Sequence, residues 1–296
     1  MACKNVMVTI AGRPNVGKST LANTLAGEKI AIVTNKPQTT RTRIFAVVNR
    51  GETQFVFIDT PGFHKAKNRL GDYMVKVVTG SVTDVDAVCL VVEPVPEVGT
   101  QEKLLLEKIA AAGAPALLVI NKIDTVPKQD LLAVIEAYRK TYDFADILPI
   151  SARTGENVEE LLEALSAYAQ EGPPLFPEDM VTDQPERQIC AEIIREKLLL
   201  CLDKEIPHGT AVVIERFSER DSGVIDLEAV IYCEKQSHKG MIIGKNGSML
   251  KKVGRLARED IEAFMGTKVY LQTWVRVKEN WRDSDSQLRN FGFRED

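Results

Sequence analysis

The sequence of 296 residues lacks several features that would place it outside the soluble globular proteins. No stretch approaches 18 consecutive apolar residues, the length that a membrane-spanning helix needs, and the N-terminus lacks the apolar core of a signal peptide. Its five cysteines are odd in number and show no C-x-x-C spacing. We therefore expect a soluble cytoplasmic protein with reduced thiols that are mostly buried.

An excess of positive charge is also missing, because the formal net charge is −4. The distribution is uneven: residues 1–186 hold 19 basic and 24 acidic side chains, whereas residues 187–296 hold 19 and 18. Between residues 235 and 258 there are seven basic side chains and no acidic ones. Any interaction with nucleic acid must therefore depend on that local patch.

The first 170 residues alternate short apolar runs with amphipathic stretches. This pattern predicts an α/β domain with a mostly parallel sheet and helices on both faces. The expected strands are 6–11, 44–48, 55–59, 87–92, 116–120 and 147–150, and the expected helices are 18–25, 101–112, 128–142 and 158–169. The turn at residues 49–52 contains Gly51 and predicts that strand 44–48 runs antiparallel to its neighbour.

A proline-rich stretch divides the chain. Residues 171–185 contain four prolines and a glycine, which exclude a helix or a central strand. We therefore divide the chain into a domain at 1–170, a linker at 171–186 and an α+β domain at 187–296. The second domain is expected to hold helices 187–202, 237–243 and 248–264 and strands 210–217, 224–233 and 269–277. Trp281, Phe291 and Phe293 could anchor its core or form a contact surface, and we favour the core.

The strongest motif lies between the first expected strand and the first expected helix. It has the form G-x-x-x-x-G-K-[ST] and comprises Gly12, Arg13, Pro14, Asn15, Val16, Gly17, Lys18 and Ser19, followed by Thr20. Glycines let the backbone N–H groups surround a phosphate at a helix start. Lys18 would reach the β- and γ-phosphates, and the Ser19 hydroxyl would bind Mg²⁺. A simple glycine turn is the less specific alternative.

A second motif distinguishes guanine from adenine. Asn121, Lys122 and Asp124 form N-K-x-D after strand 116–120. The Asp124 carboxylate can accept hydrogen bonds from guanine N1–H and the exocyclic amine, and adenine does not offer that pair of donors. This argues against an ATP-driven enzyme. Ser151, Ala152 and Arg153 follow the next strand and could supply a backbone N–H to the guanine carbonyl.

A third motif is typical of a nucleotide-dependent switch. Asp59, Thr60, Pro61 and Gly62 end the strand 55–59. Asp59 would hold Mg²⁺ through a water, and the Gly62 N–H would contact a γ-phosphate. The loop at 36–41 contains two hydroxyls, on Thr39 and Thr40, of which one should complete the metal site. The residues alone do not choose between them.

The basic patch contains a G-x-x-G loop, formed by Gly244, Lys245, Asn246 and Gly247. The apolar positions of the following helix recur at helical spacing, and the order of elements around it is similar to a type II KH domain. In such domains the loop lets the backbone of single-stranded RNA approach closely. The expected RNA contacts are these four loop residues together with Lys239, Ile242, Ile243 and Lys251. A helical hairpin with a solvated basic face is the alternative.

As an ordered set, these motifs resemble the bacterial Era family of GTPases over both domains. The resemblance implies a Mg²⁺-dependent GTPase in which Thr40 binds the metal. It implies that Asn15 ligates a stimulating K⁺ ion. It further implies a protein that binds GTP and GDP and the 3′ end of 16S ribosomal RNA, and assists assembly of the 30S subunit. We expect a monomer, with peripheral contact to the inner face of the membrane left open.

Catalysis is assigned to Lys18, Thr40 and Gly62. Phe63 stands where many switch GTPases carry a glutamine that orients the attacking water, so we expect slow intrinsic hydrolysis. His64 and His238 are assigned no catalytic role. Because of Phe63, an RNA-binding scaffold that binds nucleotide but scarcely hydrolyses it remains the alternative.

Overall fold

The structure is a computed structural model that describes residues 4–294. Contacts between residues divide the chain into two units. The first contains residues up to 31, 40–66 and 71–183, and the second contains 32–39, 67–70 and the residues from 184 onward. Within the described residues, no helix is long and apolar enough to cross a membrane.

The first unit is built on a sheet with the strand order β2-β3-β1-β4-β5-β6. The strands are β1 (Lys4–Ala11), β2 (Ile44–Arg50), β3 (Thr53–Asp59), β4 (Ala87–Val92), β5 (Ala116–Ile120) and β6 (Asp146–Pro149). All neighbouring pairs in this order are parallel except β2 and β3, as the turn at 49–52 predicts. A short β7 (Gln170–Glu171) adds antiparallel to β1.

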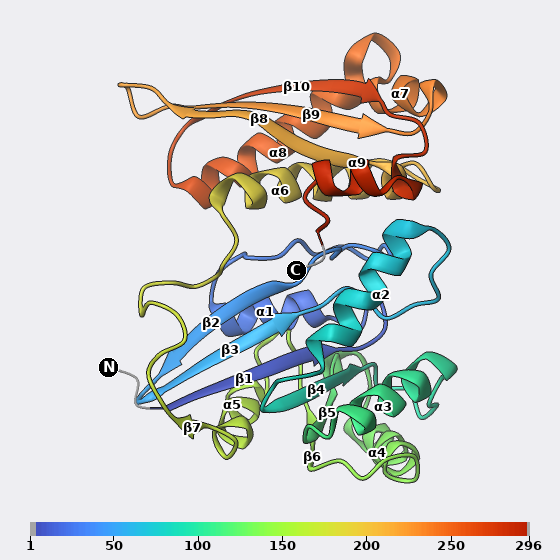
Figure 1. Cartoon of the computed structure of the whole chain (residues 1–296), viewed down its shortest axis with the longest axis vertical. Coiled ribbons are helices and arrows are strands. Elements are labelled where there is room, and N and C mark those ends of the chain that lie inside the picture. Colours follow the sequence, from blue (N-terminus) through green and yellow to red (C-terminus); the bar gives the residue numbers. More distant parts are fainter. Residues whose placement is uncertain (1–3, 295–296) are drawn as a thin grey trace. The chain divides into compact units, whose positions relative to one another are not determined.

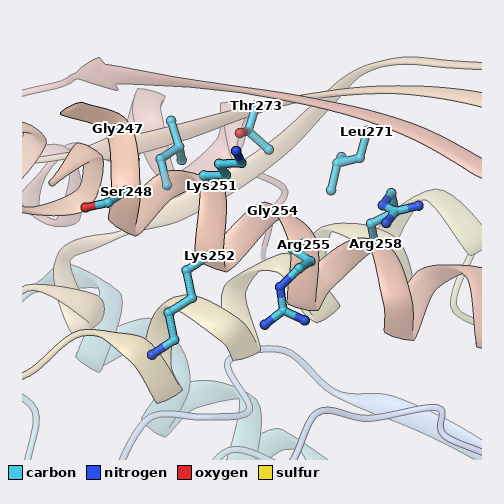
Figure 2. Close-up of a pocket in the computed structure, with 10 residues that line it drawn as sticks. Gly247, Ser248, Lys251, Lys252, Gly254, Arg255, Arg258, Leu271 and Thr273 are labelled. Carbon is cyan, nitrogen blue, oxygen red and sulfur yellow. The ribbon is translucent and has the colours of Figure 1, made fainter. Parts of the chain in front are cut away.

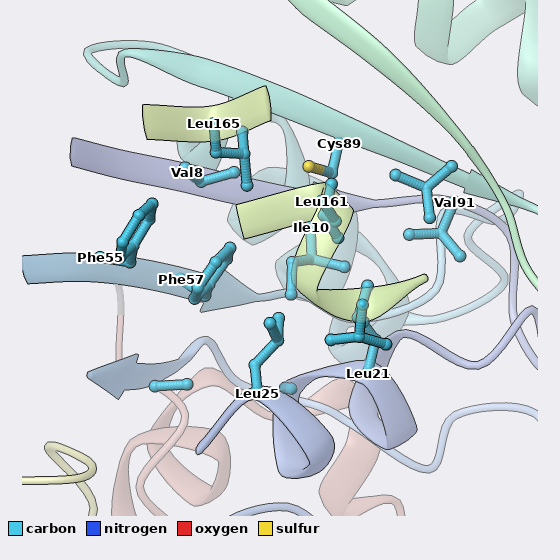
Figure 3. Close-up of a cluster of buried hydrophobic side chains, with 14 of the residues drawn as sticks. Val8, Ile10, Leu21, Leu25, Phe55, Phe57, Cys89, Val91, Leu161 and Leu165 are labelled. Atoms are coloured by element: carbon cyan, nitrogen blue, oxygen red, sulfur yellow. The ribbon is translucent and has the colours of Figure 1, made fainter. Parts of the chain in front are cut away.

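Helices cover both faces of this sheet (Figure 1). They are α1 (Lys18–Ala26), α2 (Arg69–Ser81), α3 (Thr100–Ala112), α4 (Leu131–Arg139) and α5 (Val158–Ser166). On one face, α1 and α5 pack against alternate side chains of the central strands, such as Ile10 and Phe57, in one buried cluster (Figure 3). On the other face, α2, α3 and α4 contribute to a second cluster. The predicted α/β fold is confirmed, although α2 was not predicted.

The proline-rich segment after β7 contains no helix, as expected, but it packs along the sheet. Gln54 of β3 is fully buried, and its Oε1 accepts hydrogen bonds from the backbone N–H groups of Leu175 and Phe176 at 2.7 and 2.9 Å. Further along, the Val47 N–H of β2 donates to the Val181 carbonyl at 2.9 Å. The segment thus covers the exposed edge of β2.

The second unit contains a three-stranded sheet in the order β10-β9-β8, with β9 antiparallel to β8 and parallel to β10. Its strands are β8 (Ala211–Glu219), β9 (Ile225–Cys233) and β10 (Val269–Val277). Its helices are α6 (Glu186–Cys201), α7 (Gln236–Ile243), α8 (Ser248–Met265) and α9 (Asp285–Asn290). One buried cluster joins α6 and α8 to the sheet. This is the predicted α+β order.

Aromatic side chains close the end of the second unit. Trp281 is fully buried, and its Nε1 donates to the Gly209 carbonyl at 2.9 Å. Its ring contacts those of Phe291 and Phe293, with centroids 5.2 and 6.1 Å apart. Trp281 is therefore the core anchor that we expected. The cysteines at 89, 190, 201 and 233 are free thiols, and Cys3 lies outside the described residues.

Candidate nucleotide and nucleic-acid sites

The P-loop joins β1 to α1, and two glycines determine its conformation. Gly12 and Gly17 have φ angles of 153° and 100°, which favour glycine over other residues. A Cβ atom on Gly12 would collide with the Val91 carbonyl of β4, and one on Gly17 would collide with the Asn121 side chain. The loop meets α1 at its N-terminus, where the helix has no side-chain cap. Its backbone N–H groups are therefore available to an anion.

Lys18 extends along the inner side of this loop. Its side chain is buried, and Nζ donates to the carbonyls of Gly12 and Arg13 at 3.1 and 2.8 Å. Burial lowers the pKa of Lys18 to about 8, and the nearby Asp59 carboxylate partly opposes this. A bound phosphate would add negative charge and favour the ammonium form.

Three oxygen-bearing side chains converge beside Lys18. The Ser19 hydroxyl lies 2.7 Å from the Thr40 hydroxyl and donates to Oδ2 of Asp59 at 2.7 Å. Burial raises the pKa of the fully buried Asp59 to about 6, whereas Lys18 and hydrogen bonds lower it. Oδ1 of Asp59 is buried and has no hydrogen-bond partner among the described residues. Two hydroxyls and a carboxylate are hard ligands, so this set fits Mg²⁺.

The structure distinguishes the two threonines that the sequence left open. The hydroxyl of Thr40 lies in the oxygen cluster, and its residue is 8% exposed. The hydroxyl of Thr39 instead lies 2.7 Å from that of Thr34 and donates to the Lys36 carbonyl at 2.7 Å. Thr40 is therefore the hydroxyl that this geometry offers to a metal.

The loop after β3 packs tightly on the P-loop. A Cβ atom on Gly62 would lie 2.6 Å from Cα of Pro14, so no side chain fits there. The Phe63 N–H donates to the Gly12 carbonyl at 3.0 Å, and the Phe63 ring is buried in the apolar cluster beneath α2, α3 and α4. Phe63 thus anchors the loop and offers no polar group to a water.

The guanine motif is held together by Asn121. Its Nδ2 donates to the Val16 carbonyl of the P-loop at 2.8 Å, and its Oδ1 accepts from the Ala152 N–H at 2.9 Å. Asp124 accepts from the Ser151 hydroxyl at 2.6 Å and pairs with Arg153. The hydrogen bond from Ser151 is the main cause that lowers the pKa of Asp124, so this carboxylate is ionised before a base arrives.

Two carboxylates that the sequence did not single out brace these motifs. Glu93 follows β4 and accepts from Lys122 Nζ at 2.6 Å, and the same Nζ donates to the Asn15 carbonyl at 2.6 Å. Glu102 of α3 is 1% exposed and forms an ion pair with Nε of Arg13. The P-loop is therefore tied through Arg13 to α3 and through Asn15 to the guanine motif. Because an isolated acidic residue gives no pattern, only the fold could reveal these partners.

In the second unit, the G-x-x-G loop connects α7 to α8. Gly244 and Gly247 have φ angles of 73° and 76°, and Asn246 has a φ angle of 52°. A Cβ atom on Gly244 would lie 2.7 Å from Cβ of Met249, so glycine is required there for space as well as for conformation. Lys245–Gly247 form a short 3-10 turn that leads directly into α8.

A groove of about 790 Å³ begins at this loop and runs between α8 and β10. Figure 2 shows Lys251, Gly254 and Arg258 on the helix and Leu271 and Thr273 on the strand. Its other lining residues are Gly247, Ser248, Leu250, Lys252 and Arg255. Four of the ten are basic and none is acidic among the residues described. Arg255 and Arg258 form ion pairs with Glu259 and Glu262 of α8, which lie outside the lining, so the excess positive charge of the groove rests mainly on Lys251 and Lys252.

The predicted RNA contacts fall into three groups. Gly247 and Lys251 line the groove. Lys239, Ile243, Gly244, Lys245 and Asn246 lie beside it, on α7 and the loop. The prediction for Ile242 is wrong, because its side chain is fully buried in the core of the unit, where it packs α7 against that core. The groove is also lined by Arg255, Arg258 and the strand residues, which were not among the predicted contacts, although the first two belong to the basic patch.

Two family models match the chain. The model described as 50S ribosome-binding GTPase matches residues 7–122, and the KH domain model matches residues 205–282. The chain is 48% identical over 294 residues to GTPase Era of Ruminiclostridium cellulolyticum, covering 99% of each chain. It is 50% identical over 291 residues to GTPase Era of Clostridium kluyveri, covering 98% of this chain and 99% of the relative.

Two solved structures are similar over nearly the whole chain. One is a variant of Era from Aquifex aeolicus bound to GDP·AlF4⁻, with a TM-score of 0.94, 37% identity and coverage of 99% of this chain and 100% of the other. The other is Era in complex with MgGDPNP and nucleotides 1506–1542 of 16S ribosomal RNA, with a TM-score of 0.95, 36% identity and 99% of both chains covered.

Proposed function

The chain belongs to the Era family of GTPases, and from this premise we propose that it uses GTP hydrolysis to control its hold on the 3′ end of 16S ribosomal RNA during 30S assembly. The observation that carries the proposal is the basic groove between α8 and β10, which begins at the G-x-x-G loop. A relative of similar fold is solved with that RNA. We propose the domain limits 1–170 and 187–296, with 171–186 as the linker.

In the proposed GTPase cycle, the chain's own groups hold and orient the nucleotide. Lys18 exchanges its bonds to the P-loop carbonyls for the β- and γ-phosphates. Ser19, Thr40 and Asp59 hold Mg²⁺, which neutralises charge on the phosphates when it is bound. The Gly62 N–H contacts the γ-phosphate. Loss of that phosphate then releases the loop after β3, which Phe63 anchors.

The remaining GTP contacts that we propose come from the P-loop and from the guanine motif. The base is surrounded by Asn121, Lys122, Asp124, Ser151, Ala152 and Arg153. The phosphates are surrounded by residues 12–20 and 59–62.

A stimulating K⁺ ion is also part of this proposal. Asn15 has a φ angle of 68° and lies in the P-loop next to the phosphate-binding glycines, where a second cation would act on the transition state. Since Phe63 provides no polar group for the attacking water, hydrolysis should depend on such an ion and on backbone groups. Equal hydrolysis rates in K⁺ and Na⁺ buffers of the same ionic strength would contradict this role.

The test of RNA binding uses the fragment of nucleotides 1506–1542 of 16S ribosomal RNA with a fluorescent label. We expect the wild-type protein to bind it with a strong salt dependence. Lys251→Glu should weaken binding at least tenfold and lower the slope of log K against log salt by about 0.7, the value for one single-stranded phosphate contact. Lys103→Glu, at an exposed position of α3, is the matched control.

The outcome distinguishes the proposed switch from a scaffold. If the RNA and K⁺ both raise single-turnover GTP hydrolysis, the two domains communicate. If the RNA binds but changes neither hydrolysis nor nucleotide affinity, the chain acts as a scaffold.

A cytoplasmic location and a monomeric state belong to the proposal, and sedimentation with anionic vesicles would reveal any peripheral membrane contact.

A further inference from the structure

Gly254 lies in the interior of α8 at a position where neither the backbone nor the packing requires glycine. Its φ angle is not positive, in contrast to those of Gly244 and Gly247. A Cβ atom built on it would meet no heavy atom within 4 Å. Glycine inside a helix destabilises the helix relative to alanine, because it loses more conformational freedom on folding. The residue therefore reduces stability without any benefit to the protein's own packing.

The open space beside Gly254 belongs to the basic groove. Gly247, Lys251, Gly254 and Arg258 recur at intervals of three or four residues, so they share one face of α8. Figure 2 shows Gly254 between Lys251 and Arg258 along the helix, with Leu271 of β10 across the groove. The backbone at Gly254, which carries no side chain, thus forms the middle of the groove floor. Lys251 and Arg258 lie on either side of it along the helix.

We propose that Gly254 is the position where a nucleobase of single-stranded RNA lies flat against the α8 backbone. This inference depends on the RNA-binding function proposed above. Lys251 and Arg258 lie far enough apart to meet phosphates on both sides of that base, since the seven-residue step between them extends about 10 Å along the helix axis. Leu250 and Leu271 supply apolar walls for the base, and the Thr273 hydroxyl offers one hydrogen-bonding group to its edge.

A side chain at position 254 should therefore affect stability and RNA binding in opposite directions. The variants are Gly254→Ala, which adds one methyl group, and Gly254→Leu, which fills the floor with another good helix former. The matched control is Gly80→Ala, because Gly80 lies in α2 of the first unit and a Cβ atom there also meets nothing within 4 Å. The probe is the labelled RNA of nucleotides 1506–1542.

Stability of the second unit can be measured separately, because both tryptophans of the chain, Trp274 and Trp281, belong to it. We expect tryptophan fluorescence to show a higher urea midpoint for Gly254→Ala than for the wild type. RNA affinity should fall about threefold for Gly254→Ala and at least tenfold for Gly254→Leu, while GDP affinity stays the same. Gly80→Ala should leave RNA affinity unchanged.

The measurements separate a failure of RNA binding by the protein from a failure of the contact at Gly254. If the wild-type protein does not bind the RNA, the proposed function itself is wrong. If the wild type binds but both Gly254 variants bind equally well at unchanged or higher stability, only the role of Gly254 is overturned. If Gly254→Ala weakens binding while it raises the urea midpoint, loss of folding cannot explain the effect, and the nucleobase contact is supported.

Discussion

The ion pair beneath the P-loop gives a sharp prediction, because its two partners are buried to very different degrees. Glu102 is 1% exposed, whereas the Arg13 side chain is 36% exposed. Removing Arg13 leaves a buried carboxylate without its cation, which typically costs 3–5 kcal/mol. Removing the charge of Glu102 leaves a guanidinium whose Nε is buried but whose side chain is partly exposed and lies 3.9 Å from Glu93, and we expect that to cost about 1–2 kcal/mol.

The double-mutant cycle follows from this asymmetry. Arg13→Ala should lower the free energy of unfolding by about 3 kcal/mol or more, and Glu102→Gln by about half of that or less. The double variant should be more stable than Arg13→Ala alone, because no buried charge then lacks a partner. Arg13→Ala should also weaken GTP binding, since the Arg13 carbonyl is one of the two that hold Lys18.

The assay is urea unfolding followed by far-ultraviolet circular dichroism. Tryptophan fluorescence serves as an internal control, because Trp274 and Trp281 report on the second unit, which the substitutions should not affect. Lys140→Ala removes an ion pair whose side chains are 79% and 74% exposed, so it should change stability by less than about 0.5 kcal/mol. Equal and additive effects of the two single substitutions would refute the reasoning from burial.

Two further predictions concern the carboxylates of the nucleotide site. Burial raises the pKa of Asp59 from 3.8 to about 6, so its contribution to stability is full below pH 3.8 and is lost as the pH rises through about 6. Asp59→Asn should therefore increase the free energy of unfolding of the nucleotide-free protein at pH 7.5 by at most about 3 kcal/mol, which a higher melting temperature would show. The same substitution should abolish Mg²⁺-dependent nucleotide affinity. A variant less stable than the wild type at that pH would contradict this. Asp124→Asn should weaken GTP binding about 100-fold or more and permit binding of xanthosine triphosphate, as nucleotide competition would show, and unchanged GTP affinity would remove the guanine assignment.

Local chemistry made the convergence of the nucleotide motifs predictable. The glycines at 12 and 17, the hydroxyl of Ser19 and the carboxylate of Asp124 each stand in a short motif at the end of an apolar run. Parallel strands bring such ends to one edge of a sheet, so the motifs meet without further information. The choice of Thr40 over Thr39 needed the structure or the family resemblance, because both hydroxyls are adjacent in sequence.

Features that depend on distant packing were missed. Helix α2 carries buried Leu70, Met74 and Val78 at helical spacing, but Gly71 and Gly80 weaken that pattern. Ile242 was placed in the RNA groove although the core of the second unit takes its side chain. Likewise, the proline content of the segment after β7 correctly excluded a helix, but it gave no sign that Gln54 would bind the backbone there.

The two halves of the nucleotide site differ in how ready they are before nucleotide binds. At the guanine end, Ser151 and Arg153 already hold Asp124 in its charged form, and Asn121 already bridges the neighbouring loops. At the phosphate end, burial raises the pKa of Asp59 and lowers that of Lys18, so both charges are costly there despite their mutual attraction. Phosphate and Mg²⁺ would supply the opposite charges that these groups need. The proposed base contacts are therefore preformed, whereas occupancy of the phosphate end should determine the stability of the site and the order of its loops.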